Sequence, residues 1–287
     1  MSGESGLVVV DKPGGLTSHA VVGRIRRLAG TRKVGHAGTL DPMATGVLVV
    51  GVNRATRLLG HLMLTEKAYD ATVRLGVTTS TDDAEGEVVA TAATDSLNET
   101  DVRDAFAAFA GEIDQVPSAV SAIKVDGKRA YQRVREGEQV ELASRRVTIH
   151  ELIVRAVRGN QVDLTVRCSS GTYIRALARD AGKRLGVGGH LTALRRTAVG
   201  PFELAAARTL DDLSEAFELT SITAAARAAF PAYDLDDREA TGVRFGRALD
   251  ARLPAAGPVA VFAPDGEFLA LYEQAGAQAR AVAVFTG

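Results

Sequence analysis

One acidic side chain stands in a segment that can form neither a regular helix nor a central strand. Asp41 lies in the run 35–46, which also contains three glycines and Pro42. Glycine and proline carry the largest penalties in helices, and a proline removes a hydrogen-bond donor from a sheet. The apolar run 47–52 follows and predicts a buried strand. A carboxylate on an irregular loop beside a core strand is a common way to present a catalytic group. The alternative is a structural turn in which Asp41 caps backbone donors.

Two side chains far away in the sequence could act together with this carboxylate. Tyr69 stands at the start of a predicted strand, 68–75, and offers a flat surface for stacking. Arg175 lies one turn into a predicted helix, 172–185, where it could hold a carboxylate ionised through a bidentate bond. Taken singly, the tyrosine also fits ordinary strand packing and the arginine an ordinary solvated helix position.

Several other chemistries are disfavoured by residue types and spacing. The glycine-rich runs 12–15 and 35–46 lack the spacing and the lysine of a loop that binds nucleoside triphosphates. Cys168 is the only cysteine, which excludes an internal disulfide and a cysteine-based metal cluster. The acids nearest to Asp41, Asp82 and Asp83, lie on a different loop, which argues against a hydrolytic carboxylate pair. We therefore expect neither a metal nor a nucleotide cofactor.

The charge distribution is more informative than the net charge of −1. Residues 1–60 contain eight Lys and Arg against three Asp and Glu, and residues 121–200 contain sixteen against seven. Residues 61–120 and 201–287 are acidic. The two basic blocks could form one positive surface suited to nucleic acid, although solvated charged faces are the alternative. No export signal and no apolar stretch of roughly 20 residues is visible, so we expect a cytoplasmic protein outside the membrane.

The order of predicted elements favours an α+β fold, because strands and helices are mixed without regular βαβ alternation. We expect one large domain over 1–230 and a small β-rich module over 231–287, where short apolar runs alternate with Pro and Gly turns. The basic segment 117–138 suits an element that closes over a charged ligand. Expected strands are 7–10, 47–52, 68–75, 147–157, 161–168 and 190–199; expected helices are one capped by Thr17 or Ser18, then 55–64, 99–109, 172–185, 210–218 and 221–229.

Six segments, taken in order, resemble the TruB family of pseudouridine synthases, which act on uridine 55 in the T loop of tRNA. The resemblance covers nearly the whole chain and departs at Ser80, where family members often carry an acid. It implies a pseudouridine-synthase core with a mixed, mostly antiparallel sheet, followed by a PUA-like RNA-binding domain at 231–287. The family reaction breaks the bond between uracil and ribose, rotates the base and rejoins it through carbon, without a cofactor. The matching segments are 11–18, 34–46, 67–69, 117–124, 171–175 and 191–197.

The resemblance also implies roles for the three side chains singled out above. Asp41 would be the catalytic carboxylate, by attack on ribose, by attack on uracil or by removal of a ribose proton. Arg175 would favour its ionised form. Tyr69 would stack on the target base and could take part in late proton removal.

The resemblance also implies roles in substrate binding for four further residues. The target uridine would be flipped out of its loop, and His36 would occupy the space left behind. Lys12 and Pro13 would support the loop that carries Asp41. Leu194 would form part of the wall of the uracil pocket, and 117–138 would be a thumb over the RNA loop.

The implied partner is tRNA, bound through its T arm by a monomer that needs no other protein. Two other functions stay open from the sequence. One is an RNA-folding chaperone, in which binding and base flipping matter apart from catalysis. The other is the related enzyme that works within guide-RNA complexes, although no extension for docking partners is evident.

Overall fold

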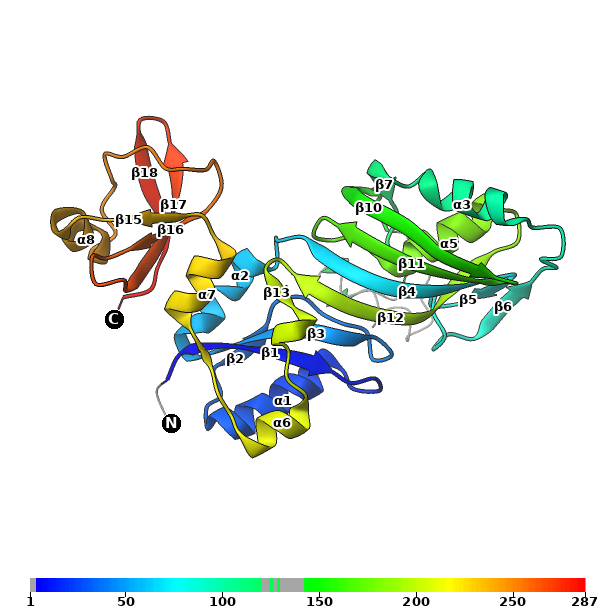
Figure 1. The fold of residues 1–287 in the computed structure, drawn as a ribbon, viewed down its shortest axis with the longest axis horizontal. Helices are drawn as coiled ribbons and strands as arrows, with labels where there is room; N and C mark the ends of the chain where they lie inside the picture. Colours follow the sequence, from blue (N-terminus) through cyan, green and yellow to red (C-terminus); the bar gives the residue numbers. More distant parts are fainter. Residues whose placement is uncertain (1–3, 120–123, 126–127, 130–141, 287) are drawn as a thin grey trace.

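The main sheet runs through the larger part of the molecule and joins strands from both ends of the sequence. The computed structural model describes residues 4–119, 124–125, 128–129 and 142–286 (Figure 1). The strand order is β14-β1-β3-β12-β4-β11-β10-β7, with β2 beside β3 and β13 beside β12. Only the β3–β12 pairing is parallel among the described strand pairs of this sheet, which confirms a mixed, mostly antiparallel core. The strands are β1 (Gly6–Lys12), β2 (Val34–His36), β3 (Thr45–Val52), β4 (Lys67–Leu75), β7 (Gly111–Gln115), β10 (Arg145–Arg158), β11 (Gln161–Cys168), β12 (Gly189–Val199), β13 (Phe202–Glu203) and β14 (Thr220–Ser221).

Among the described elements, four helices cover one face of this sheet. Burial alternates along β4, where every second residue is buried, as the period-two pattern predicts. The buried side chains of β4 and its neighbours share a hydrophobic core with these helices. Helix α1 is capped at its start by the Thr17 hydroxyl and ends at Gly30, whose φ is +61°. The covering helices are α1 (Ser18–Ala29), α3 (Glu99–Ala107), α5 (Ile174–Arg184) and α6 (Leu210–Glu215).

The opposite face of β1 and β3 packs against a second group of elements. The core on this side contains residues of α7 (Ile222–Ala229), of the 53–62 region and of the C-terminal sheet. The predicted helix over 55–64 is shorter than expected, because Asn53–Arg57 is a 3-10 helix and α2 covers only Leu59–Leu62. Among the described residues, no helix is long and apolar enough to cross a membrane.

The C-terminal region forms a separate four-stranded sheet with its own core, which confirms the expected β-rich module (Figure 1). Helix α8 (Asp237–Arg244) was not predicted. Its start carries a reciprocal capping box between Asp236 and Glu239, and this pair is a signal that the sequence offers. The strands are β15 (Ala232–Asp234), β16 (Val259–Phe262), β17 (Phe268–Ala275) and β18 (Gln278–Val284).

One helix boundary differs from expectation, one hairpin was not expected, and one prediction lies mostly outside the described residues. Helix α3 ends at Ala107 and not at 109, and β7 begins at Gly111, whose φ is +91°. The unexpected hairpin pairs β5 (Val77–Thr79) with β6 (Val88–Thr91). Of the expected thumb, the structure describes a pairing of β8 (Lys124–Val125) with β9 (Lys128–Arg129), while 120–123, 126–127 and 130–141 lie outside the described residues.

Candidate active site

The loop that carries Asp41 connects β2 with β3 and is irregular, as predicted. Two side chains from other elements hold it on either side of the acid. The Ser18 hydroxyl accepts from the Leu40 amide at 2.8 Å and donates to the Leu40 carbonyl at 3.0 Å. The fully buried Lys12 Nζ donates to the carbonyl oxygens of Leu16 at 2.6 Å and Pro42 at 3.1 Å. The position of the Asp41 backbone is therefore determined by contacts to both of its neighbours.

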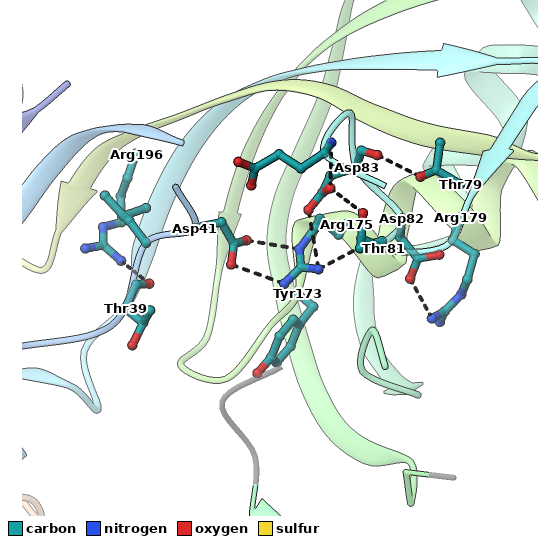
Figure 2. Close-up of polar contacts among 12 residues, drawn as sticks. Thr39, Asp41, Thr79, Thr81, Asp82, Asp83, Tyr173, Arg175, Arg179 and Arg196 are labelled. Atoms are coloured by element: carbon teal, nitrogen blue, oxygen red, sulfur yellow. Dashed lines mark hydrogen bonds and ion pairs between the residues drawn. The ribbon is translucent and has the colours of Figure 1, made fainter. Parts of the chain in front are cut away.

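The guanidinium of Arg175 contacts both oxygens of the Asp41 carboxylate (Figure 2). Nη2 lies 3.2 Å from Oδ1, and Nε lies 3.0 Å from Oδ2. The arginine side chain is only 4% exposed, whereas the aspartate side chain is 32% exposed. The Nη2 contact is a charge-assisted hydrogen bond and the Nε contact is an ion pair, and together they fix the orientation of the carboxylate as well as its distance. Arg175 is thus a buried partner of Asp41 and not a solvated helix residue.

A second carboxylate contacts the same guanidinium. Asp83 Oδ2 lies 3.5 Å from Arg175 Nη1, which also donates to the Thr81 carbonyl at 2.8 Å (Figure 2). The Asp83 side chain is 4% exposed, and its Oδ1 accepts from the Glu85 amide at 3.0 Å. The sequence places Asp83 on a different loop, so its closeness to the Asp41 site was missed. A hydrogen bond from the Leu191 amide to the Asp82 carbonyl, 3.0 Å, ties this loop to β12.

The electrostatic balance at Asp41 has opposing causes. Burial raises the pKa of Asp41 above its ordinary value, and the charge of Asp83 raises it further. The charge and the hydrogen bond of Arg175 lower this pKa, so they limit the rise. Burial also lowers the pKa of Lys12 to about 8, although the nearby charge of Asp41 opposes this effect. Arg175 is therefore the main group that favours the ionised carboxylate.

Asp41 opens into a pocket of about 260 Å³. Tyr69, 8% exposed, forms part of its wall, and burial raises the pKa of the Tyr69 phenol while Arg196 lowers it. Within the described ranges, no group of three or more His, Cys, Asp or Glu side chains could hold a metal ion. Apolar walls with a few convergent polar groups are typical of a site for a small ligand or a single base. The other side chains of the lining include Lys67, Arg145, Tyr173, Ile174, Leu194 and Arg196.

Family models match the chain from residue 26 to residue 286. Residues 26–174 match the N-terminal domain of the TruB family pseudouridylate synthases. The chain belongs to the TruB family. Residues 175–232 match the tRNA pseudouridylate synthase B C-terminal domain, and 230–286 match the C-terminal region of tRNA pseudouridine synthase II. This TruB-family chain is accordingly an enzyme, a tRNA pseudouridine synthase of the isomerase class.

Individual relatives are similar over nearly their full lengths. The chain is 59% identical over 295 residues to tRNA pseudouridine synthase B of Arthrobacter sp. (strain FB24), covering 98% of this chain and 96% of the relative. It is 55% identical over 290 residues to the protein of the same name from Thermobifida fusca (strain YX), covering 98% and 99%. A chain in the "Crystal Structure of a Cbf5-Nop10-Gar1 Complex" superposes with a TM-score of 0.76 at 27% identity, covering 98% of this chain and 85% of that one. The TruB-family enzyme therefore shares its fold with a chain of that complex.

In this TruB-family enzyme, four of the seven residues singled out from the sequence line one pocket: Asp41, Tyr69, Arg175 and Leu194. Lys12 lies behind the Asp41 loop. Pro13 is exposed and His36 is half-buried in β2, opposite Val50, and both lie outside the lining of this pocket.

Lys67 and Arg196 line the same pocket of the TruB-family enzyme but were not singled out from the sequence. Both are buried, at 7% and 1% exposure. Each stands in one of the matching segments, 67–69 and 191–197. Burial lowers the pKa of Lys67 to about 8, and its Nζ donates to the Thr65 carbonyl at 2.6 Å. The position of a cation within a matching segment was a signal that could have been used.

Proposed function

We propose that this enzyme converts uridine 55 in the T loop of tRNA to pseudouridine, with Asp41 as the catalytic carboxylate. The observation that carries the proposal is the paired contact between Arg175 and Asp41, at 3.2 and 3.0 Å, on the rim of a pocket whose wall contains Tyr69. The name tRNA pseudouridine synthase B, borne by relatives of 55–59% identity, supports tRNA as the substrate.

The target base leaves its stack in the RNA loop before it reaches the carboxylate. A pocket of about 260 Å³ suits one base better than a stacked pair, and enzymes that act on a base generally extrude it. Tyr69 stacks on the extruded uracil, and Leu194 packs against it. His36 occupies the space that the base leaves behind. Lys12 and Pro13 keep the Asp41 loop in place during this exchange.

The chemistry at Asp41 needs its ionised form. The bond between ribose C1′ and uracil N1 breaks, a bond between C1′ and C5 forms, and the C5 proton is finally lost while N1 gains a proton. Atoms and electrons balance without a redox step or a group donor. Attack on ribose, attack on uracil and removal of a ribose proton all begin from the carboxylate. Arg175 supports each route, because it lowers the pKa of Asp41.

The rest of the tRNA binds to the basic surface of the enzyme and to the C-terminal module. Residues 231–287 act as a PUA-like RNA-binding domain, and 117–138 as a thumb on the T loop. The catalytic domain is 1–230, and the enzyme works as a monomer in the cytoplasm. Because basic side chains contact phosphates, binding weakens as salt rises.

The test uses Asp41→Asn and unmodified tRNA, with purified protein and no additives. We expect wild-type protein to form pseudouridine at position 55, and the Asp41→Asn protein to bind tRNA without forming product. Asp70→Asn is the matched control, because Asp70 is exposed on β4 beside Tyr69 and accepts a hydrogen bond from Thr165 at 2.9 Å. Nucleoside chromatography is the readout, since isomerisation leaves the mass unchanged. Substantial turnover by the Asp41→Asn variant, or product at another position only, would contradict the proposal.

A further inference from the structure

Arg196 lies at the junction between the two strands that carry the site. It is 1% exposed and has the largest side chain among the nearly fully buried residues. On β12, its backbone pairs with Tyr69 of β4 on one side and with Gly46 of β3 on the other. Only two residue pairs join β3 to β12 in the described sheet, and the pair with Gly46 is one of them. The backbone of Arg196 therefore links the strand after the Asp41 loop to the strand of Tyr69.

The side chain of Arg196 joins both ends of the Asp41 loop. On the side before the acid, Nη2 donates to the Gly38 carbonyl at 3.1 Å. Nη1 donates on the same side to the Thr39 carbonyl at 3.4 Å (Figure 2). Nε donates to the Val47 carbonyl at 2.7 Å, on the side after it. A guanidinium is planar and presents its donors in a fixed arrangement. One rigid group thus determines the separation of the two ends.

The backbone contact at Gly46 leaves no space for adjustment. A Cβ at this position would lie 2.2 Å from the Arg196 carbonyl oxygen, and the glycine φ is +97°. Both values exclude other residues without movement of β3 or β12. The second end of the Asp41 loop is consequently held by backbone packing as well as by the guanidinium.

The charge of Arg196 is not matched by a carboxylate. No ion pair joins it to an acid in the part of the chain that the structure describes, and its donors are met by backbone carbonyl oxygens. Burial of a cation is costly, and apolar replacements of buried charges are often no less stable. Fold stability alone therefore does not account for an arginine here. The charge of Arg196 also lowers the pKa of Tyr69, against the effect of burial.

We propose that Arg196 is a positioning residue for the isomerisation, which sets the Asp41 carboxylate and the Tyr69 ring relative to each other in the pocket. It acts through the loop and through the phenol, and does not itself react with the base. The inference rests on the proposed function and adds to it a residue that determines the geometry of the reacting groups.

The test compares Arg196→Lys with the adjacent Arg195→Lys. Lysine retains the charge but cannot reproduce the three donors of the guanidinium. The control position is 41% exposed and pairs with Asp11 at 2.7 Å. We expect Arg196→Lys to lower the single-turnover rate about 100-fold, as a displacement of reacting groups by about 1 Å does, with unchanged Kd for tRNA. Arg195→Lys should retain the wild-type rate.

Each other outcome contradicts the inference. A wild-type rate for Arg196→Lys would overturn it, and so would a parallel loss of tRNA affinity, which would make Arg196 an RNA-binding residue. If the lysine variant lacks cooperative unfolding, Arg196→Gln is measured in the same way, and failure of both to fold would leave only a structural role. Absence of product at position 55 with wild-type enzyme would instead overturn the proposed function, and this inference with it.

Discussion

Arg175 contacts Asp41 through two nitrogen atoms, Nη2 at 3.2 Å from Oδ1 and Nε at 3.0 Å from Oδ2. The arginine is almost completely buried, and the carboxylate faces the pocket. A third contact, with Asp83 at 3.5 Å, places a second acid on the far side of the same guanidinium. One guanidinium therefore interacts with two carboxylates. A change in Arg175 or in Asp83 should alter the ionisation of Asp41.

Arg175→Lys should lower the rate of pseudouridine formation by about 100-fold or more, because an ammonium cannot contact both Asp41 oxygens and the Thr81 carbonyl together. Affinity for tRNA should persist, since Arg175 is buried behind the carboxylate. Single-turnover kinetics with binding measurements separates the two effects. Arg184→Lys, in the last turn of the same helix, is the control. A rate near that of wild type would show that bidentate contact is not required.

The pH dependence of catalysis should follow the raised pKa of Asp41. Activity requires the carboxylate, so the rate should fall with decreasing pH before an ordinary aspartate, with pKa 3.8, would be protonated. A pH–rate profile under single-turnover conditions gives this acidic limb, and an inflection at or below 3.8 would contradict the expectation.

Stability should change in the opposite direction with pH. The native state binds the Asp41 proton more tightly than the unfolded state, since the folded pKa is raised. The free energy of unfolding of wild type, relative to Asp41→Asn, should therefore decrease as pH rises from below 3.8 through the raised pKa. Urea unfolding of both proteins across this range measures the difference. If the stability of wild type relative to Asp41→Asn instead increased with pH, the lowering of the Asp41 pKa by Arg175 would exceed the rise caused by burial.

Asp83→Asn should move the acidic limb of the rate profile to lower pH, because the charge of Asp83 raises the pKa of Asp41. The maximal rate should also fall, on the order of tenfold, since Arg175 loses a charged contact that orients it. Asp82→Asn is the matched control, as its carboxylate contacts Arg179 at 3.2 Å instead. An unchanged acidic limb in the Asp83→Asn protein would mean that the two acids are electrostatically independent.

Lys12→Met should lower the free energy of unfolding by about 3 kcal/mol, because the buried Lys12 ammonium is the shared donor to the partly buried carbonyl groups of Leu16 and Pro42. Activity should fall as well, since one of these carbonyls belongs to Pro42, next to Asp41. Lys33→Met, at an exposed position, should change neither quantity. Chemical unfolding and single-turnover rates provide the two measurements. A Lys12→Met protein as stable and as active as wild type would contradict the support role.

Most of the regular elements, and the irregular loop that presents the acid, could be predicted from the amino-acid sequence. Alternation of residue types over 68–75 predicted β4, a cap at Thr17 or Ser18 predicted the start of α1, and glycines with Pro42 predicted an irregular loop at Asp41. These are local properties of the chain, so local patterns report them. The family resemblance in six separate segments added Asp41, Tyr69 and Arg175 as one set, which periodicity could not do.

The contacts of Asp83 and Arg196 follow from the tertiary structure and could not be predicted from local sequence patterns. Asp83 approaches Arg175 because its loop is tied to β12 through Leu191, and Arg196 reaches the Asp41 loop because β12 pairs with both β3 and β4. Neither contact leaves a periodic trace in the sequence, since each joins residues from distant segments through strand pairing. Burial is likewise a property of the assembled core. In the sequence Lys12, Arg175 and Arg196 resemble ordinary surface cations, whereas in the structure all three are buried beside the site.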